Sequence, residues 1–220
     1  MAEMEPDGEP RDRRLSASLL AAVGAVATLG GAFAISRRRR RAQLAAHEAA
    51  LRELAAELNA EFEPSVPGPS GPDFPRMTAV QRGRRVVVDT EVAGATTGYR
   101  LLTRATAEHK ARISGFVVVR EETALTRVAD ALGLADVQVG EAAFDNRFEV
   151  TSDLPDAANL LQPEVRDTLL AARFESVVIR QDEVTVRQLG PLTEVEELRQ
   201  LMKLAVDVAE WLETLNGGTA

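Results

Sequence analysis

The sequence contains no cysteine and only two histidines, and these absences exclude several chemistries. Without a thiol there can be no disulfide framework, thiolate metal site or cysteine nucleophile. His47 and His109 lie in unrelated segments, so we expect both side chains to be solvated and no histidine metal cluster within one chain. No glycine-rich phosphate loop, nucleophile elbow or metalloprotease histidine pair is present. We therefore assign no catalytic, cofactor-binding or metal-ligating residue, and no cofactor.

Lysine is also scarce, with Lys110 and Lys203 against 24 arginines, a composition typical of a bacterial gene of high G+C content. Residues 77–220 carry 23 acidic and 16 basic side chains, a net charge of −7. Such an acidic domain disfavours nucleic acid as a partner. Carboxylates are dense between residues 141 and 156, but they lack the glycine and the closing glutamate of an EF-hand loop, so we expect no calcium site.

The longest stretch without a charge runs from Leu15 to Ser36. As a helix with a rise of 1.5 Å per residue it would reach roughly 33 Å, about the thickness of a hydrocarbon core. We therefore predict a single transmembrane helix over residues 15–36, with the lipid bilayer as its partner. Residues 1–14 combine prolines with mixed charges and show no apolar period, so we predict a disordered tail there.

A cleaved secretory signal is the alternative interpretation of this stretch, because Ala32-Phe33-Ala34 has the small-x-small form of a cleavage site. However, the apolar run is longer than the roughly 7 to 15 residues of a typical signal core. The pair Arg13-Arg14 also invites a twin-arginine export signal, which the following residues match poorly. A retained helix fits the sequence better.

Orientation follows from the arginines on either side of the predicted span. Arg11, Arg13 and Arg14 precede it, and five arginines follow it directly: Arg37, Arg38, Arg39, Arg40 and Arg41. The side richer in basic residues stays in the cytoplasm, so we predict an inner (plasma) membrane protein with its N-terminus outside and its C-terminal domain cytoplasmic. The same arginines are a candidate contact for anionic lipid headgroups. A topology signal is the simpler explanation of the run.

Small residues recur every four positions within the predicted span, at Gly24, Thr28 and Ala32. This small-xxx-small pattern lets two membrane helices approach closely, so a homodimer is a candidate state. An alanine- and glycine-rich run also produces such spacings by chance.

Residues 37–62 predict a basic juxtamembrane segment that continues into an amphipathic helix. Its apolar side chains fall near one side: Leu44, Leu51, Leu54, Leu58 and Phe62. This stripe could pair with a second copy as a short coiled coil, lie on the membrane surface, or fold back on the domain. The sequence leaves the three alternatives open.

Residues 63–76 predict a proline-rich linker. The prolines are Pro64, Pro67, Pro69, Pro72 and Pro75, which forbid a helix and favour extended polyproline geometry. At about 3.1 Å per residue, such a linker would hold the domain up to roughly 40 Å from the preceding helix.

Residues 77–215 predict one α+β domain that folds alone, with a mostly antiparallel sheet packed by helices. Valine-rich runs indicate strands, and turn residues between them indicate hairpins at residues 77–92 and 177–186. Helices are expected from Thr123, Asp153 and Pro163, and a closing helix with a wide apolar stripe follows Thr193. Residues 216–220 predict a second disordered tail.

The stretch from Gly140 to Leu170 is the most distinctive. It resembles an uncharacterised family of bacterial proteins anchored to the membrane at the N-terminus, which has a domain of unknown function. The residues that carry the resemblance are Phe144, Asp145, Phe148, Val150, Leu160, Leu161 and Pro163. The resemblance implies no known activity. From the residues themselves we expect Phe144 and Phe148 to be buried and Asp145 to serve a turn.

Two classes of function fit these observations. The first is a non-catalytic module that binds an unknown protein partner at the cytoplasmic membrane face. The alternative is a membrane-tethered enzyme of unknown reaction, which would need converging carboxylates that the sequence cannot nominate. A buried polar pocket would favour the enzyme, and an exposed apolar groove would favour the module.

Overall fold

The computed structural model describes residues 38–68, 71–95, 98–121 and 137–217. The chain divides into two units, residues 1–44 and 45–220. Of the first unit, only residues 38–44 are described, and they are helical. Within the described ranges, no helix is long and apolar enough to cross a membrane. The predicted tail 1–14, span 15–36 and helix from Thr123 to Gly133 lie outside the described residues.

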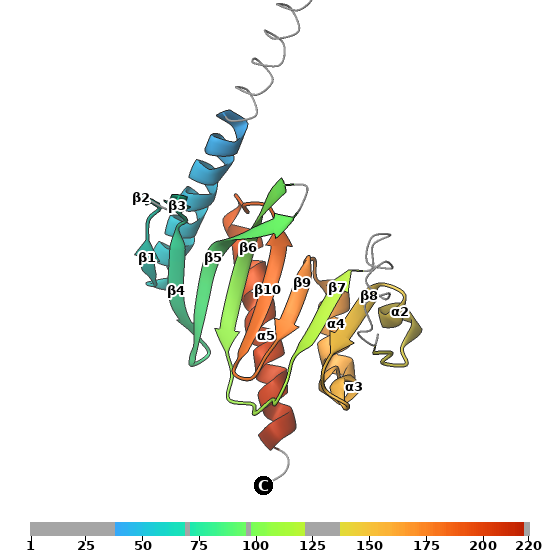
Figure 1. Cartoon of the computed structure of the whole chain (residues 1–220). Coiled ribbons are helices and arrows are strands. Elements are labelled where there is room, and N and C mark those ends of the chain that lie inside the picture. The colour runs from blue at the N-terminus through green and yellow to red at the C-terminus, as the bar shows by residue number, and fades with distance from the viewer. Residues whose placement is uncertain (1–37, 69–70, 96–97, 122–136, 218–220) are drawn as a thin grey trace, which may run out of the picture. The chain divides into compact units, whose positions relative to one another are not determined.

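The second unit is built on an eight-stranded antiparallel sheet (Figure 1), which confirms the predicted α+β class. The strand order is β1-β4-β5-β6-β10-β9-β7-β8. In chain order the strands are β1 (Glu61–Glu63), β4 (Arg76–Gln81), β5 (Arg84–Ala95), β6 (Gly98–Glu108), β7 (Val117–Glu121), β8 (Phe148–Ser152), β9 (Ser176–Ile179) and β10 (Glu183–Leu189).

The hairpin between β4 and β5 shows why these residues form strands. Arg82 and Gly83 both have positive φ, 49° and 77°, as a two-residue turn of the type I′ class requires. This turn places Val86 opposite Ala79 and Val88 opposite Met77. These four side chains are buried, so the register is fixed by the apolar face.

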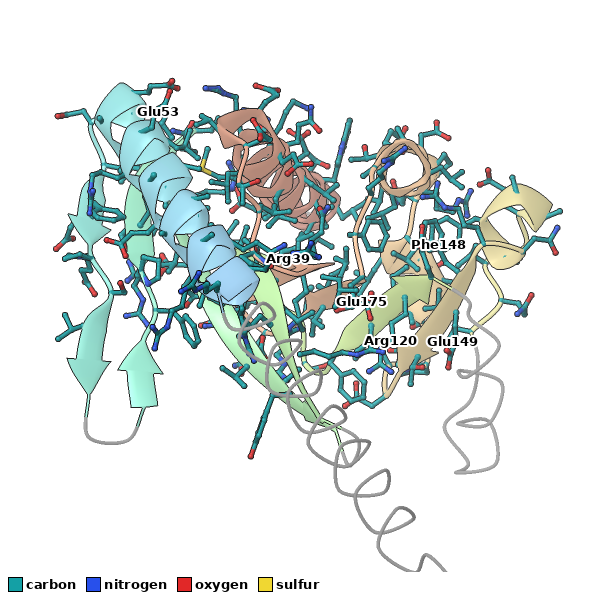
Figure 2. The ribbon with its side chains drawn as sticks, turned by 90° about the horizontal axis from the view of Figure 1, so that it is seen from above. Arg39, Glu53, Arg120, Phe148, Glu149 and Glu175 are labelled. Atoms are coloured by element: carbon teal, nitrogen blue, oxygen red, sulfur yellow. The ribbon has the colours of Figure 1, made fainter. Side chains whose placement is uncertain are left out.

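Helices cover one face of the sheet (Figure 2). They include α2 (Ala142–Asp145), α3 (Ala157–Leu160), α4 (Pro163–Ala171) and the long α5 (Val195–Gly217). The predicted apolar stripe of α5 is buried, with Leu198, Ala205, Val208 and Leu212 fully covered. The predicted closing helix across the sheet is therefore confirmed.

The helix before the sheet, residues 38–58, corrects the predicted domain boundary. From residue 45 onward this helix belongs to the folded unit, and its side chains Leu51 and Leu54 are fully buried in the same core as the sheet valines. Of the three predicted alternatives for its apolar stripe, the structure shows folding back on the domain. The domain therefore does not begin at residue 77.

The predicted linker at residues 63–76 is also wrong. Strands β2 (Val66–Gly68) and β3 (Gly71–Asp73) pair antiparallel, with Pro67 opposite Pro72. Strand β1 pairs with β4 through Phe62 opposite Met77, so the chain reverses on itself here. An isolated two-stranded pair can carry prolines because its edges need no further ladder hydrogen bonds. The segment joins the helix closely to the sheet and does not hold them apart.

Candidate interaction surface

The face of the sheet turned away from the helices is the candidate site. Side chains alternate between the two faces along a strand. Those that point away from the helices form what we call the open face, and no described helix lies over it (Figure 2). Its central members are Arg76, Thr78, Arg85, Val87, Asp89, Glu91, Arg104, Thr106, Glu108, Val118, Arg120, Val178, Arg180, Glu183, Thr185 and Arg187.

A row of β-branched residues crosses the middle of the open face. The register places these residues opposite one another on seven neighbouring strands, and Thr106 and Thr185 approach to 3.2 Å between their hydroxyl oxygens. In strand order the row reads Thr78, Val87, Thr106, Thr185, Val178, Val118 and Thr151. Side chains of this kind pack well on a pleated surface and form a shallow, weakly polar floor.

Charged residues flank this floor in a connected network. Asp89, only 6% exposed, accepts two hydrogen bonds from Arg104, at 2.8 Å to Oδ1 and 2.6 Å to Oδ2. Arg187 donates to Glu91 at 2.8 Å, and Glu91 lies 3.8 Å from Arg104. The hydrogen bond to Asp89 raises the pKa of Arg104 above its ordinary value. The two-pronged pairing fixes the guanidinium plane of Arg104 on the open face.

Two arginines of the open face do not take part in this network of ion pairs. Arg120 and Arg180 are exposed, and the structure records no ion pair between either guanidinium and a described residue. Arg120 stands opposite Glu149 in register, and both lie on the side of the sheet away from the helices (Figure 2).

A hollow of about 280 Å³ lies over the β-branched floor. Five arginines border it, and Asp89 and Glu183 are the acidic groups among its lining residues. The arginines are Arg76, Arg85, Arg104, Arg180 and Arg187. Four of these arginines already pair with carboxylates of the open face. The guanidinium of Arg180 has no recorded ion pair with a described residue, and it can bind a carboxylate with two parallel hydrogen bonds.

The helix side has a larger cavity of about 620 Å³ between α4, α5 and β10. Its charged groups are engaged with one another: Lys203 lies 2.6 Å from Asp207, which also accepts from Arg82 at 2.9 Å. An acid–base pair needs two carboxylates that converge on one point. Glu197 and Asp207 are the carboxylates among the described lining residues, and no recorded contact joins them.

The prediction that the two histidines are solvated is wrong. His47 is fully buried and His109 is 6% exposed. The carbonyl oxygen of Leu192 lies 2.6 Å from Nδ1 of His47, so Nδ1 carries the proton and donates. Nε2 then accepts from the hydroxyl of Thr90 at 3.1 Å. These contacts hold the helix at residues 45–58 to β5 and to the segment before α5, which is a structural role.

The buried histidine predicts a loss of stability in acid. Burial lowers the pKa of His47 below its ordinary 6.5, while the Leu192 carbonyl and Glu48 oppose this shift. Below about pH 6.5 the unfolded chain binds a proton that the folded chain resists, so stability is present at neutral pH and falls as the pH drops through the folded pKa. Burial also lowers the pKa of His109, in the same direction.

We expect the free energy of unfolding in urea to decrease between about pH 7.5 and about pH 5.5. His47→Gln should reduce this decrease, because only His109 would still contribute. A variant whose unfolding free energy keeps the full pH dependence would contradict the assignment.

The carboxylates between residues 141 and 156 are used in local structure. Asp145 accepts from the backbone N–H groups of Val139 and Gly140, both at 3.0 Å, which confirms its predicted turn role. Asp153 accepts from the N–H of Phe116 at 2.7 Å, and Glu141 pairs with Arg166 at 2.6 Å. Among the described residues, no group of three or more histidine, aspartate or glutamate side chains could hold a metal ion.

Arg38, Arg39, Arg40 and Arg41 are exposed, while Arg37 lies outside the described residues. The open face was not predicted, although polar residues alternate with valines along residues 85–92. That alternation was its only signal.

Comparison with known proteins gives one informative likeness. No family model matches the sequence, and no curated protein sequence matches it. The crystal structure of the mycobacterial trehalose monomycolate transport factor A, TtfA, is similar with a TM-score of 0.53 and 12% sequence identity. The match covers 76% of this chain and 94% of that chain. At this identity the likeness shows a shared fold alone.

Proposed function

We propose, starting from the fold that this chain shares with TtfA, that the protein is a non-catalytic accessory protein that docks a partner protein on its open face. The observation that carries the proposal is the contrast between the two faces of the sheet. One face is buried under helices. The other crosses seven strands with a β-branched floor and an arginine rim, and no described helix lies over it. The segment at residues 62–74 borders this face at Arg76, Asp89 and Arg104.

The chemistry of the open face favours a protein with exposed carboxylates as the partner. The floor is broad and shallow, whereas small-molecule sites are enclosed and bury most of their ligand. Arginine is enriched in protein interfaces because its flat guanidinium combines packing with directed hydrogen bonds. Arg120 and Arg180, which lack a described ion-pair partner, supply the charge that an acidic partner surface would complement.

The membrane tether completes the proposal. Residues 15–36 would span the inner membrane, and the arginines at 37–41 would keep the domain in the cytoplasm. TtfA is named a trehalose monomycolate transport factor. Because the predicted tether would keep the open face near the membrane, we propose that the partner of this chain is a membrane protein whose cytoplasmic part reaches that face.

Charge reversal on the open face tests the docking proposal. We expect the full chain carrying Arg120→Glu and Arg180→Glu to capture its partner from detergent-solubilised membranes at least about tenfold less than the wild type, because about 1.4 kcal/mol of binding corresponds to a factor of ten. The measurement is quantitative mass spectrometry of the captured proteins.

Lys203→Glu is the matched control, because Lys203 is 64% exposed, lies on α5 and borders the cavity on the helix side. It should leave capture unchanged. Equal capture by all three proteins, or loss of capture in the Lys203 variant alone, would contradict docking on the open face. Recovery of only a second copy of this chain would assign the face to self-association and not to a partner.

A further inference from the structure

Exposed apolar side chains gather at one end of the sheet. Val92 is 46% exposed, Leu189 is 54% exposed, and Tyr99, the only tyrosine in the chain, is 78% exposed. Val92 stands opposite Leu101 and Leu189 opposite Leu102. Tyr99 is the second residue of β6, the strand that also holds Leu101 and Leu102. We call these three residues the apolar rim. The ends of β5 and β10 and the start of β6 meet there (Figure 1).

The apolar rim lies next to buried core residues, and its members belong to both faces of the sheet. Its neighbours Leu101 and Leu102 are buried, at 8% and 7% exposure. Along β5, Val92 follows the helix-side residues Val88 and Thr90, whereas Leu189 follows Arg187 on the open face. Exposed apolar side chains lie on both faces at this end of the sheet. The end as a whole, rather than one face, therefore presents apolar surface to its surroundings.

The chain enters the folded unit at this same end. His47 is hydrogen-bonded to Thr90 and to the carbonyl of Leu192, and Thr90 lies two residues before Val92. From Thr90 to Gly94, which pairs with Tyr99, four strand residues extend about 13 Å. Val92 and Tyr99 therefore lie at the end of the sheet where His47 attaches the helix at residues 45–58.

We propose that the apolar rim contacts the surface of an anionic lipid membrane. The inference rests on the membrane tether of the proposed function, which ends at residue 36 and leaves only eight residues before Ala45. Tyrosine is favoured at the headgroup level, because its ring is apolar and its hydroxyl is polar. Arg100, next to Tyr99, lies 3.7 Å from Glu175 but keeps 61% of its side chain exposed, so anionic headgroups can still reach its guanidinium.

A single-cysteine experiment in the full chain tests this inference, because the protein has no cysteine of its own. A fluorophore at Tyr99→Cys is compared with one at Val80→Cys, after reconstitution into vesicles of phosphatidylcholine and phosphatidylglycerol that carry a headgroup-level quencher. Val80 is the matched control, because it is a 72% exposed strand residue next to the turn at the opposite end of β5. A third fluorophore, at Ala25→Cys with a quencher deep in the acyl chains, reports the tether itself.

We expect the quencher to reduce the fluorescence at position 99 several-fold more than at position 80, and the deep quencher to reduce it at position 25. Quenching at 25 with equal quenching at 99 and 80 would overturn the rim contact and leave the tether standing. Quenching at 99 without quenching at 25 would support the rim contact and overturn the tether. Quenching at neither 99 nor 25 would overturn both.

Discussion

A chain that begins at Met77 should show no cooperative unfolding transition, whereas a chain that covers residues 38–217 should unfold cooperatively. The shorter chain lacks Leu51 and Leu54, both fully buried, and Ala55, which is 2% exposed. Burial of a leucine contributes about 1.5 to 3 kcal/mol, and a domain of this size is stable by only about 5 to 15 kcal/mol. The truncation also removes these side chains from the core cluster that contains Val86 and Val88.

Urea unfolding followed by circular dichroism would measure this effect, and a matched pair of point variants would locate it. Leu54→Ala should lower the free energy of unfolding by about 2 to 5 kcal/mol. Glu53→Ala, at the exposed neighbouring position labelled in Figure 2, should change it by less than about 0.5 kcal/mol. If the chain from Met77 unfolded with the same free energy as the longer chain, the helix would not belong to the core.

Phe148→Ala is expected to cost about 3 to 5 kcal/mol of stability. The Phe148 ring is 3% exposed and stacks on Phe174 with 5.2 Å between ring centroids. Phe144 packs at 4.9 Å, and the guanidinium of Arg147 lies 4.8 Å from the ring centroid. Removing the ring leaves a cavity and deprives three side chains of their common contact.

The measurement is again the free energy of unfolding in urea. Tyr99→Ala is the control, because this aromatic side chain is 78% exposed and should contribute less than about 0.5 kcal/mol in the absence of a membrane. A cost below about 1 kcal/mol for Phe148→Ala would mean that the aromatic cluster does not organise this end of the sheet.

The elements that follow from local patterns could be predicted from the sequence. The β4–β5 and β9–β10 hairpins, the helix that begins at Pro163 and the stripe of α5 all lie near their predicted places. Burial of Phe144 and Phe148 was also expected and is confirmed. In each case the signal is contained in a few adjacent residues, such as a valine run beside a turn or a proline at a helix start.

The boundary of the domain could not be predicted in the same way. The stripe through Leu51 and Leu54 is equally suited to a second helix, a lipid surface or the sheet, and only contacts with residues far along the chain decide between them. The prolines at residues 64–75 indicate an extended backbone but not its reversal through β2 and β3. His47 is buried by Thr90 and Leu192, which local sequence does not connect to it.

The open face could not be predicted from the sequence, because its composition depends on the order of the strands in the sheet. Alternation along β5 separates Val87 and Asp89 from the buried valines, but it does not say which strands lie beside them. The strand order β6-β10-β9-β7 places Arg104 opposite Arg187, and Arg120 in the same row beyond Ser176, from segments up to 83 residues apart. Nonlocal pairing of this kind is the part of a fold that periodicity cannot supply.

Crosslinking from the open face in living cells tests the central claim most directly. A photoreactive residue at Arg85, which is 56% exposed on β5, is compared with the same residue at the exposed Gln200 on α5. The docking proposal predicts that position 85 gives a crosslink to one membrane protein and that position 200 gives none. The same crosslink from both positions, or crosslinks from position 200 alone, would contradict the claim that the open face is the docking surface.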